Sequence, residues 1–281
     1  MKEYKHILYN KTEDGIVTIT LNRPEVFNAF NREMANELLC ALDAFEDAED
    51  EWFCILTGAG KAFCAGEDLK NINLDALPEE QARATFDALT DYHMIISTIL
   101  ETPKPIVAAL NGIAAGAGLS IALACDKRFA VGPGEAKLVP GFATLGLTPD
   151  AGMIVLLERF MNKRQVRDWC EKGFSMSERD AEGMFMISGF SELGDLYDSP
   201  IAYARNLKEN RSLAEFGATK ALLNAEILYL LDKHIFDLEL KHQPELEQGE
   251  DFREGLAAFK ERRKPRFNRN LRRDDDDTRE A

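Results

Sequence analysis

The chain has 281 residues, of which 45% are hydrophobic and 30% are charged, a composition typical of a globular protein with a buried core. Its formal net charge of −15 argues against a nucleic-acid partner and against binding to anionic membrane surfaces. No apolar run reaches the roughly 18 residues that a membrane span requires, and the first residues lack the apolar core of a signal peptide. We therefore expect a cytoplasmic protein with no membrane and no nucleic-acid partner.

Cysteine usage agrees with a reducing compartment. The five cysteines are an odd number, are scattered along the chain, and mostly have apolar neighbours. This distribution is typical of reduced core residues and not of a disulfide framework. No group of cysteines and histidines has the spacing of metal ligands, so no metal site is expected.

Strands and helices alternate up to about residue 200. Apolar and β-branched spacing predicts strands at 15–21, 52–57, 106–110 and 127–131, a short extended piece at 136–142, and helices at 31–48, 77–101, 151–160 and 163–170. This alternation predicts an α/β fold with a buried and largely parallel sheet.

The sequence changes character after residue 200. No further strand is expected, and helices are predicted over 200–209, 213–243 and 252–262. We therefore divide the chain into a core over 1–199, a helical module over 200–267 that packs on its own body or on a neighbour, and a disordered tail over 268–281.

Two corners rich in small residues give the strongest functional signal. In the first corner, the strand at 106–110 leads through Gly116, Ala117 and Gly118 into a helix. Such a corner offers unpaired backbone N–H groups and the positive end of a helix dipole, and its small side chains let a ligand approach the backbone. It can hold a phosphate, or the oxygen of a thioester while negative charge develops there. A tightly packed corner without a ligand explains this stretch equally well when it is taken alone.

A second corner follows the strand at 52–57. Small residues run through Ala65 and Gly66, and the acidic residues Glu67 and Asp68 after them suit the first turn of a helix. If each corner contributes one N–H group, the two together would form an oxyanion hole with two donors.

These two corners resemble those of the crotonase (enoyl-CoA hydratase/isomerase) superfamily. The similarity lies in Phe-Cys-Ala-Gly-Glu-Asp-Leu at 63–69 and Asn-Gly-Ile-Ala-Ala-Gly-Ala-Gly at 111–118, and it continues through 21–30, 145–152 and 253–263. The resemblance implies a crotonase-like spiral of ββα turns with a helical C-terminal module that mediates oligomerisation. It also implies a homotrimer or a dimer of trimers, and an acyl-CoA substrate. Coenzyme A would enter as part of the thioester, with no other cofactor.

The resemblance also assigns roles to individual residues. The two backbone donors that hold the enolate fall on Ala65 and Ala117. The remaining positions implied for the acyl group are Gly66, Glu67, Asp68, Gly116, Ser120, Phe142 and Leu145, and those implied for coenzyme A are Arg23, Val26, Phe259 and Arg263. The basic segment at 260–273 either contributes to binding the coenzyme A phosphates or is a solvated terminal segment.

The sequence departs from the hydratases of this superfamily at both of their glutamates. Ser120 and Phe142 occupy the two positions, and neither side chain can activate water and deliver a proton to carbon. One carboxylate, Asp150, remains where isomerases of the superfamily place theirs. The segment Gly-Leu-Thr-Pro-Asp at 146–150 is similar to the phenylacetate-pathway ring-epoxide isomerases, which also act as Δ3,Δ2-enoyl-CoA isomerases. The residues after it, Gly-Met-Ile-Val at 152–155, differ from that group and leave the acyl group open.

We therefore expect an acyl-CoA isomerase that shifts a double bond, or rearranges a ring epoxide, through a thioester enolate with Asp150 as its only base. One alternative is another superfamily reaction, catalysed by a hydrolase, dehydratase, decarboxylase, lyase or hydratase in which Asp150 or Glu67 acts. A second is a coenzyme A-binding subunit without activity. Both acids also have structural interpretations, since Thr-Pro-Asp at 148–150 suits a helix N-cap and Glu67 suits a first helical turn.

Overall fold

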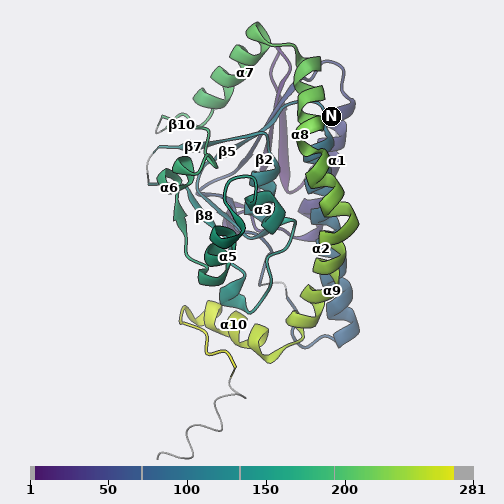
Figure 1. Ribbon diagram of the computed structural model, residues 1–281, viewed down its shortest axis with the longest axis vertical. Helices are drawn as coiled ribbons and strands as arrows, with labels where there is room; N and C mark the ends of the chain where they lie inside the picture. Colours follow the sequence, from purple (N-terminus) through teal and green to yellow (C-terminus); the bar gives the residue numbers. More distant parts are fainter. Residues whose placement is uncertain (1–3, 71, 133, 193, 269–281) are drawn as a thin grey trace, which may run out of the picture.

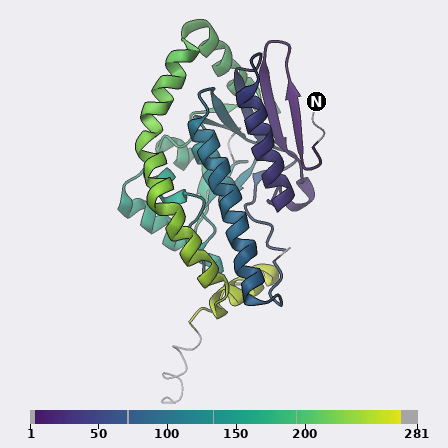
Figure 2. The same cartoon turned by 90° about the vertical axis from the view of Figure 1, so that its right-hand side faces the viewer.

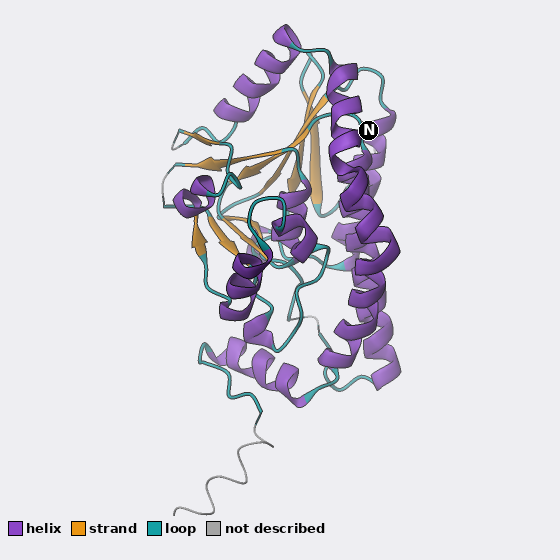
Figure 3. Cartoon of the chain, in the orientation of Figure 1, coloured by secondary structure: helices purple, strands orange, loops and turns teal. Residues whose placement is uncertain are grey.

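Two sheets form the centre of the molecule and helices cover them (Figure 3). The computed structural model describes residues 4–70, 72–132, 134–192 and 194–268. The strands are β1 (Ile7–Lys11), β2 (Ile16–Leu21), β3 (Phe53–Gly58), β4 (Ala62–Cys64), β5 (Ile106–Leu110), β6 (Ile113–Ala115), β7 (Lys127–Val131), β8 (Lys137–Val139), β9 (Met176–Ser177) and β10 (Gly189–Ser191). The helices up to residue 183 are η1 (Pro24–Val26), α1 (Arg32–Asp47), α2 (Pro78–Glu101), α3 (Ala117–Ala124), η2 (Ala143–Leu145), α4 (Met153–Leu157), α5 (Lys163–Lys172) and α6 (Glu178–Gly183). Those that follow are α7 (Asp198–Asn210), α8 (Leu213–Leu230), η3 (Leu231–Ile235), α9 (Phe236–Glu247) and α10 (Glu250–Glu261).

The chain winds as a spiral between the two sheets. The larger sheet has the order β1-β2-β3-β5-β7-β10 and the smaller one the order β4-β6-β8-β9. Each of the consecutive pairs β3/β4, β5/β6 and β7/β8 places one strand in each sheet, and a helix follows each pair. All neighbours in the larger sheet are parallel except β1 and β2. This arrangement confirms the predicted spiral of ββα turns.

Burial explains why the central strands were recognisable. Every residue of β3 and of β5 is buried, as expected for parallel strands that are covered on both faces. The predicted apolar stripe of the first long helix is also buried, at Met34, Leu38, Ala41, Leu42 and Phe45 of α1. In α2 the prediction fails at Phe86, which is 46% exposed although the other expected positions are buried.

Three predicted features of the backbone are wrong. The antiparallel edge strand β1 and the short strands β9 and β10 were not expected. The single helix predicted over 213–243 is divided into α8 and α9 by the π-helical turn η3. No helix begins at Glu67, because this residue forms a parallel bridge with Phe30 and the next helix starts at Pro78.

The C-terminal helices pack on the body of their own chain. The long green helices α8 and α9 run beside α2, and α10 crosses the lower end of the molecule (Figures 1 and 2). The predicted disordered tail falls almost entirely outside the described residues. Within the described ranges, no helix combines the length and apolar character needed to cross a membrane. All five cysteines are free, and Cys54, Cys64 and Cys125 are buried.

Candidate active site

The two small-residue corners are in direct backbone contact. Gly66 has a φ of +88°, and a Cβ atom on it would lie 2.9 Å from the carbonyl oxygen of Ala115. A Cβ atom on Gly116 would lie 3.8 Å from the Cα atom of Gly66. Both glycines therefore serve this close approach, and the corner after β4 lies against the start of α3.

The hydrogen bonds of the first corner revise the expected donor. The amide of Ala65 donates to the carbonyl of Phe27 at 3.1 Å, so it is already satisfied within the chain. Phe30 donates to the carbonyl of Gly66 at 2.7 Å and accepts from Asp68 at 2.9 Å. The bridge thus uses the carbonyl of Gly66 and the amide of Asp68, and the amide of Glu67 between them has no partner within the described chain. The available donor is thus two residues beyond the one expected.

The second corner leaves the amide of Ala117 unused by the described chain. This residue is the first of α3, and its N-cap, Gly116, has a φ of +51° and provides no side chain as a cap. The amides of Leu119 and Ser120 both bond to the carbonyl of Gly116, at 2.9 and 3.1 Å. No hydrogen bond within the described residues uses the amide of Ala117, which leaves it available to a ligand at the positive end of the helix.

The contact between the corners predicts a cost for even one methyl group. A Cβ atom on Gly118 would lie 2.6 Å from Cβ and 2.7 Å from the carbonyl oxygen of Cys64. We expect Gly118→Ala to lower the free energy of unfolding by about 1–3 kcal/mol, because backbone must shift to relieve the overlap. Urea denaturation would measure the loss. Gly183→Ala is the matched control, since a Cβ atom there meets nothing within 4 Å. Equal stability of the two variants would contradict this description of the contact.

Asp150 is buried beside these corners, with one carboxylate oxygen held and the other free. Its Oδ2 accepts a hydrogen bond of 2.8 Å from Nε2 of Gln243, and its buried Oδ1 has no partner within the described chain. Burial raises the pKa of Asp150 well above its usual range, and the nearby Glu239 and Glu247 carboxylates raise it further. The residue does not cap α4, whose N-cap is Gly152. The helix-cap interpretation of this aspartate is therefore not supported.

Ser120 and Phe142, the two residues expected at the positions of the hydratase glutamates, both lie at this site. The hydroxyl of Ser120 donates to the main-chain carbonyl of Asp150 at 3.3 Å, so it joins α3 to the segment that carries the aspartate. The ring of Phe142 approaches Gly116, with Cζ 3.9 Å from where a Cβ atom of that glycine would stand. Both side chains are buried, and neither offers an ionisable group.

A second acid of the site, Glu67, is paired with a tyrosine of α2. The hydroxyl of Tyr92 donates to Oε2 of Glu67. Burial raises the pKa of Glu67 to about 7, and the carboxylates of Glu247 and Asp68 also raise it. Glu67 and Tyr92 line one side of a cavity of about 180 Å³ between α1 and α2. Glu67 also contributes to the raised pKa of Asp150.

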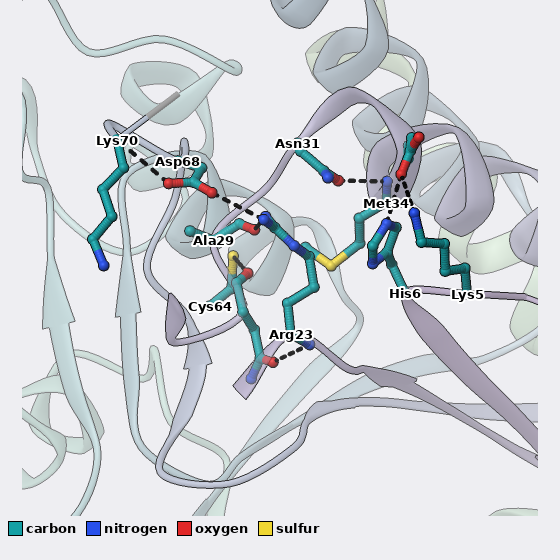
Figure 4. Close-up of polar contacts among 11 residues, drawn as sticks. Lys5, His6, Arg23, Ala29, Asn31, Met34, Cys64, Asp68 and Lys70 are labelled. Carbon is teal, nitrogen blue, oxygen red and sulfur yellow. Dashed lines mark hydrogen bonds and ion pairs between the residues drawn. The ribbon is translucent and has the colours of Figure 1, made fainter. Parts of the chain in front are cut away.

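Arg23 is turned inward and not toward a ligand. Its Nη2 forms an ion pair of 3.0 Å with Oδ2 of Asp68, and its Nη1 donates to the carbonyl of Ala29 at 2.5 Å (Figure 4). Both charged side chains are buried. Asp68 also accepts from the amide of Lys70 at 3.3 Å. Arg23 and Asp68 therefore hold the loops around the first corner, and Arg23 is not free to bind a coenzyme A phosphate.

The other residues expected at coenzyme A are on the surface. Val26 is half-buried in η1, and Phe259 is 59% exposed on α10. Arg263 pairs with Glu254 and Glu261, each at 2.5 Å, so its charge is already compensated by acids of α10. These three residues are not in contact with Asp150 in the structure.

Helix α10 and the segment at η2 lie close together. A Cβ atom on Gly255 of α10 would lie 2.7 Å from the Cα atom of Leu145. Leu145 therefore belongs to the seam between η2 and α10, with its backbone packed against the helix.

Sequence reasoning missed three residues, two of which contact the acids directly while the third holds the amide of Gly152 in the turn after Asp150. They are Tyr92 on α2 and Glu239 and Gln243 on α9. Polar residues recur every four positions at 239, 243 and 247, which indicates one helical face. That pattern alone could not show that the face is turned toward Asp150, since solvent-exposed helices carry the same spacing.

Known proteins are similar to this chain in sequence and in fold. The family model for enoyl-CoA hydratase/isomerase matches residues 11–270. The chain is 33% identical over 261 residues to the 1,2-epoxyphenylacetyl-CoA isomerase of Escherichia coli, covering 92% of this chain and 97% of that protein. It is also 33% identical over 267 residues to a Rhodobacter capsulatus protein named probable enoyl-CoA hydratase, covering 93% and 98%.

A solved structure supports the fold independently. The crystal structure of an enoyl-CoA hydratase from Mycobacterium avium subsp. paratuberculosis superposes with a TM-score of 0.82, covering 94% of this chain and 99% of that one at 23% identity. The family match, the two relatives and the ββα spiral agree with one another. The chain belongs to the enoyl-CoA hydratase/isomerase family of the crotonase superfamily, and it is an enzyme of that superfamily.

Proposed function

We propose that this enzyme is an acyl-CoA isomerase that shifts a double bond from C3 to C2 through a thioester enolate. Asp150 is its base, and the amides of Glu67 and Ala117 hold the enolate oxygen. The observation that carries the proposal is the carboxylate of Asp150, which is buried with Oδ1 unpartnered while Gln243 holds Oδ2. A carboxylate with one free oxygen next to two available amides has the parts that proton transfer at an enolate requires.

The reaction needs a single proton carrier. Oδ1 of Asp150 removes a proton from C2 of the 3-enoyl thioester, and the electron pair of that C–H bond moves into the conjugated system as a dienolate. The negative charge on the thioester oxygen is stabilised by the amides of Glu67 and Ala117. Asp150 then returns its proton to C4 and the double bond forms between C2 and C3. No water is added and none is lost, so the substrate and product have equal mass.

The surroundings of Asp150 support this role. Burial raises its pKa, so the ionised carboxylate is a stronger base than an aspartate in water. By the resemblance to the superfamily, Phe142 and Ser120 occupy the positions of the two hydratase glutamates, and neither side chain can activate water. One relative is named 1,2-epoxyphenylacetyl-CoA isomerase, so a ring epoxide of an aromatic acyl-CoA is a second candidate class of substrate.

One observation favours hydration as a second candidate reaction. Glu67, with a pKa of about 7 and a hydrogen bond from Tyr92, is an acid that could exchange protons with water beside Asp150. A relative that is named a hydratase fits this possibility as well. Isomerisation remains our proposal because it requires only one base, Asp150. Glu67 then takes part through its backbone amide, and its carboxyl group needs no role in proton transfer.

We also propose contacts for the coenzyme and an assembly. Val26, Phe259 and Lys260 would contact coenzyme A, whereas Arg23 and Arg263 are left out because acids of the chain already pair with their charges. A homotrimer or a dimer of trimers would bury apolar side chains that one chain leaves in solvent. Leu222 and Leu223 of α8 are 81% and 69% exposed, which supports such burial.

Incubation with a 3-enoyl-CoA in D₂O tests the proposed reaction. We expect the product to be the 2-enoyl thioester, without the mass of an added water. Deuterium should appear at C4 to the extent that the proton on Asp150 exchanges with solvent before it is returned. Mass spectrometry and NMR would read both quantities. A parallel incubation with a 2-enoyl-CoA tests hydration, because water adds to the conjugated double bond, and a 3-hydroxyacyl product that gains the mass of one water would favour that reaction. If 3-enoyl thioesters of varied acyl chains gave neither isomer nor deuterium exchange, and 2-enoyl thioesters gave no hydration product, both reactions would be rejected.

A further inference from the structure

One face of α9 carries polar side chains that reach the segment around Asp150. Glu239, Gln243 and Glu247 are spaced by four residues and therefore share a face of the helix. Glu239 accepts from the amide of Gly152 at 3.1 Å, and Gln243 contacts the segment on the other side of the aspartate. Glu247 accepts a hydrogen bond from the hydroxyl of Thr85 on α2. This face is thus buried between α2 and the segment at 148–152.

Gln243 contacts Asp150 through one end of its amide and the backbone through the other. Its Nε2 donates to Oδ2 of Asp150 at 2.8 Å, and its Oε1 accepts from the amide of Thr148 at 3.3 Å. The reverse orientation would place a carbonyl oxygen against a carboxylate and an NH₂ group against an N–H, so both contacts fix the same orientation. Gln243 is 1% exposed, and its amide therefore holds one oxygen of Asp150 and leaves the other free.

Glu239 holds the turn that follows Asp150. Ala151 and Gly152 both have positive φ, +51° and +69°, and a Cβ atom on Gly152 would lie 2.8 Å from Cδ2 of Leu231 in η3. The carboxylate of Glu239 accepts from the amide of Gly152 and is 2.8 Å from Nε2 of His93. The ring of His93 stacks on Phe236 with centroids 3.6 Å apart. The π-helical turn and the first turn of α9 therefore pack directly on the loop that carries the base.

We propose that α9 is a positioning element of the active site, in which Gln243 and Glu239 orient the carboxylate of Asp150 and act on its ionisation in opposite directions. This inference rests on the proposed role of Asp150 as a base. Gln243 and Glu239 are positioning residues, because they act through Asp150 and its loop.

The opposition follows from the chemistry of the two side chains. The NH₂ group of Gln243 can only donate, so it favours the ionised carboxylate of Asp150 and lowers its pKa. Glu239 is a like charge when ionised, so it favours the protonated carboxylate and raises that pKa. The other ionisable groups that act on Asp150 are Glu247 on α9, Tyr92 on α2 and Glu67 in the first corner, while His93 on α2 contacts Glu239.

The expected pH effects have opposite signs. A base is active only when ionised, so kcat falls as the pH drops through the pKa of Asp150, which defines the acid limb of the profile. We expect Gln243→Leu to move this limb up by about one pH unit or more, because a hydrogen bond to the charged form is lost. We expect Glu239→Gln to move it down by about one pH unit, because a like charge is removed while an acceptor for Gly152 remains.

The experiment measures kcat against pH for isomerisation of a 3-enoyl-CoA by the full chain. Glu245→Gln is the matched control, because Glu245 is on the exposed face of the same helix. The acid limb of this variant's pH profile should coincide with that of the native enzyme. Limb shifts of opposite sign support the inference. Loss of activity with the limb unmoved, or shifts of the same sign, would overturn it. If Gln243→Leu fails to fold, Glu239→Gln keeps the side-chain size and carries the test alone.

Asp150→Asn in the same assay separates this inference from the proposed function. If Asp150→Asn retains turnover, the role of Asp150 is wrong whatever α9 does. If Asp150→Asn is inactive and the acid limb is unchanged in Gln243→Leu and Glu239→Gln, the base is correct and the positioning role of α9 is wrong.

Discussion

Asp150→Asn is expected to lower kcat by about 10²- to 10⁴-fold, the range that a positioned general base contributes. Asparagine keeps the size of the side chain, and its carbonyl can still accept from Nε2 of Gln243. It cannot take the C2 proton, so the enolate does not form at the normal rate. KM should change little, because the amides that hold the thioester oxygen are on other segments.

The same variant should fold at least as well as the native enzyme. Asp150 is a buried acid near Glu239 and Glu247, so a neutral residue removes a desolvated charge and two like-charge interactions. Thermal unfolding and steady-state kinetics on one preparation would measure both effects. Asp168→Asn on the exposed face of α5 is the control for an aspartate change without consequence. Turnover close to that of the control would mean that another group removes the proton.

The parts of the fold that were predictable are those that local sequence determines. The strands at 53–58 and 106–110 are continuous apolar runs because both faces of a parallel strand are buried. The glycines at 66 and 116 mark places where backbone meets backbone, and the alternation of strands and helices gives the spiral its order. Asp150 was identifiable because it is the carboxylate that the superfamily motif places there.

The donor of the first corner could not be predicted, because it depends on pairing between distant segments. Phe30 pairs with the backbone on either side of Glu67, and Phe27 accepts from Ala65, so the available amide is fixed by contacts across more than thirty residues of sequence. Ala65 and Glu67 belong to the same corner, and only the partner of each amide distinguishes them. The pairing of Arg23 with Asp68 was missed for the same reason.

The contribution of α9 was also beyond a sequence argument. The helix prediction over 213–243 had the right composition but missed η3, because a π-helical turn leaves no clear residue signature. That turn places Leu231 against Gly152 and continues into the helix that carries Gln243. A polar residue on a long helix is usually solvated, so the burial of Gln243 became apparent only when α9 was seen packed on α2.

Ala117→Pro removes one proposed donor without removing a side chain of the site. Ala117 is the first residue of α3, the helical position at which proline is favoured and an N–H is not used within the helix. The proline ring puts carbon where the amide hydrogen stands, so the enolate oxygen loses one of its two hydrogen bonds. We expect kcat/KM for the 3-enoyl-CoA to fall by about 10²- to 10³-fold, the usual effect of losing one oxyanion donor.

The control must separate a lost donor from a disturbed helix. Lys163→Pro introduces proline at the same position of α5, where the side chain is exposed and the N-cap Asn162 has extended backbone that suits a following proline. Both variants should unfold close to the native temperature, and only Ala117→Pro should lose activity. Native kcat/KM in Ala117→Pro would show that the amide does not hold the enolate. Because the base and the donors act on the same enolate, Ala117→Pro combined with Asp150→Asn should be little slower than the worse single variant, whereas independent roles would multiply.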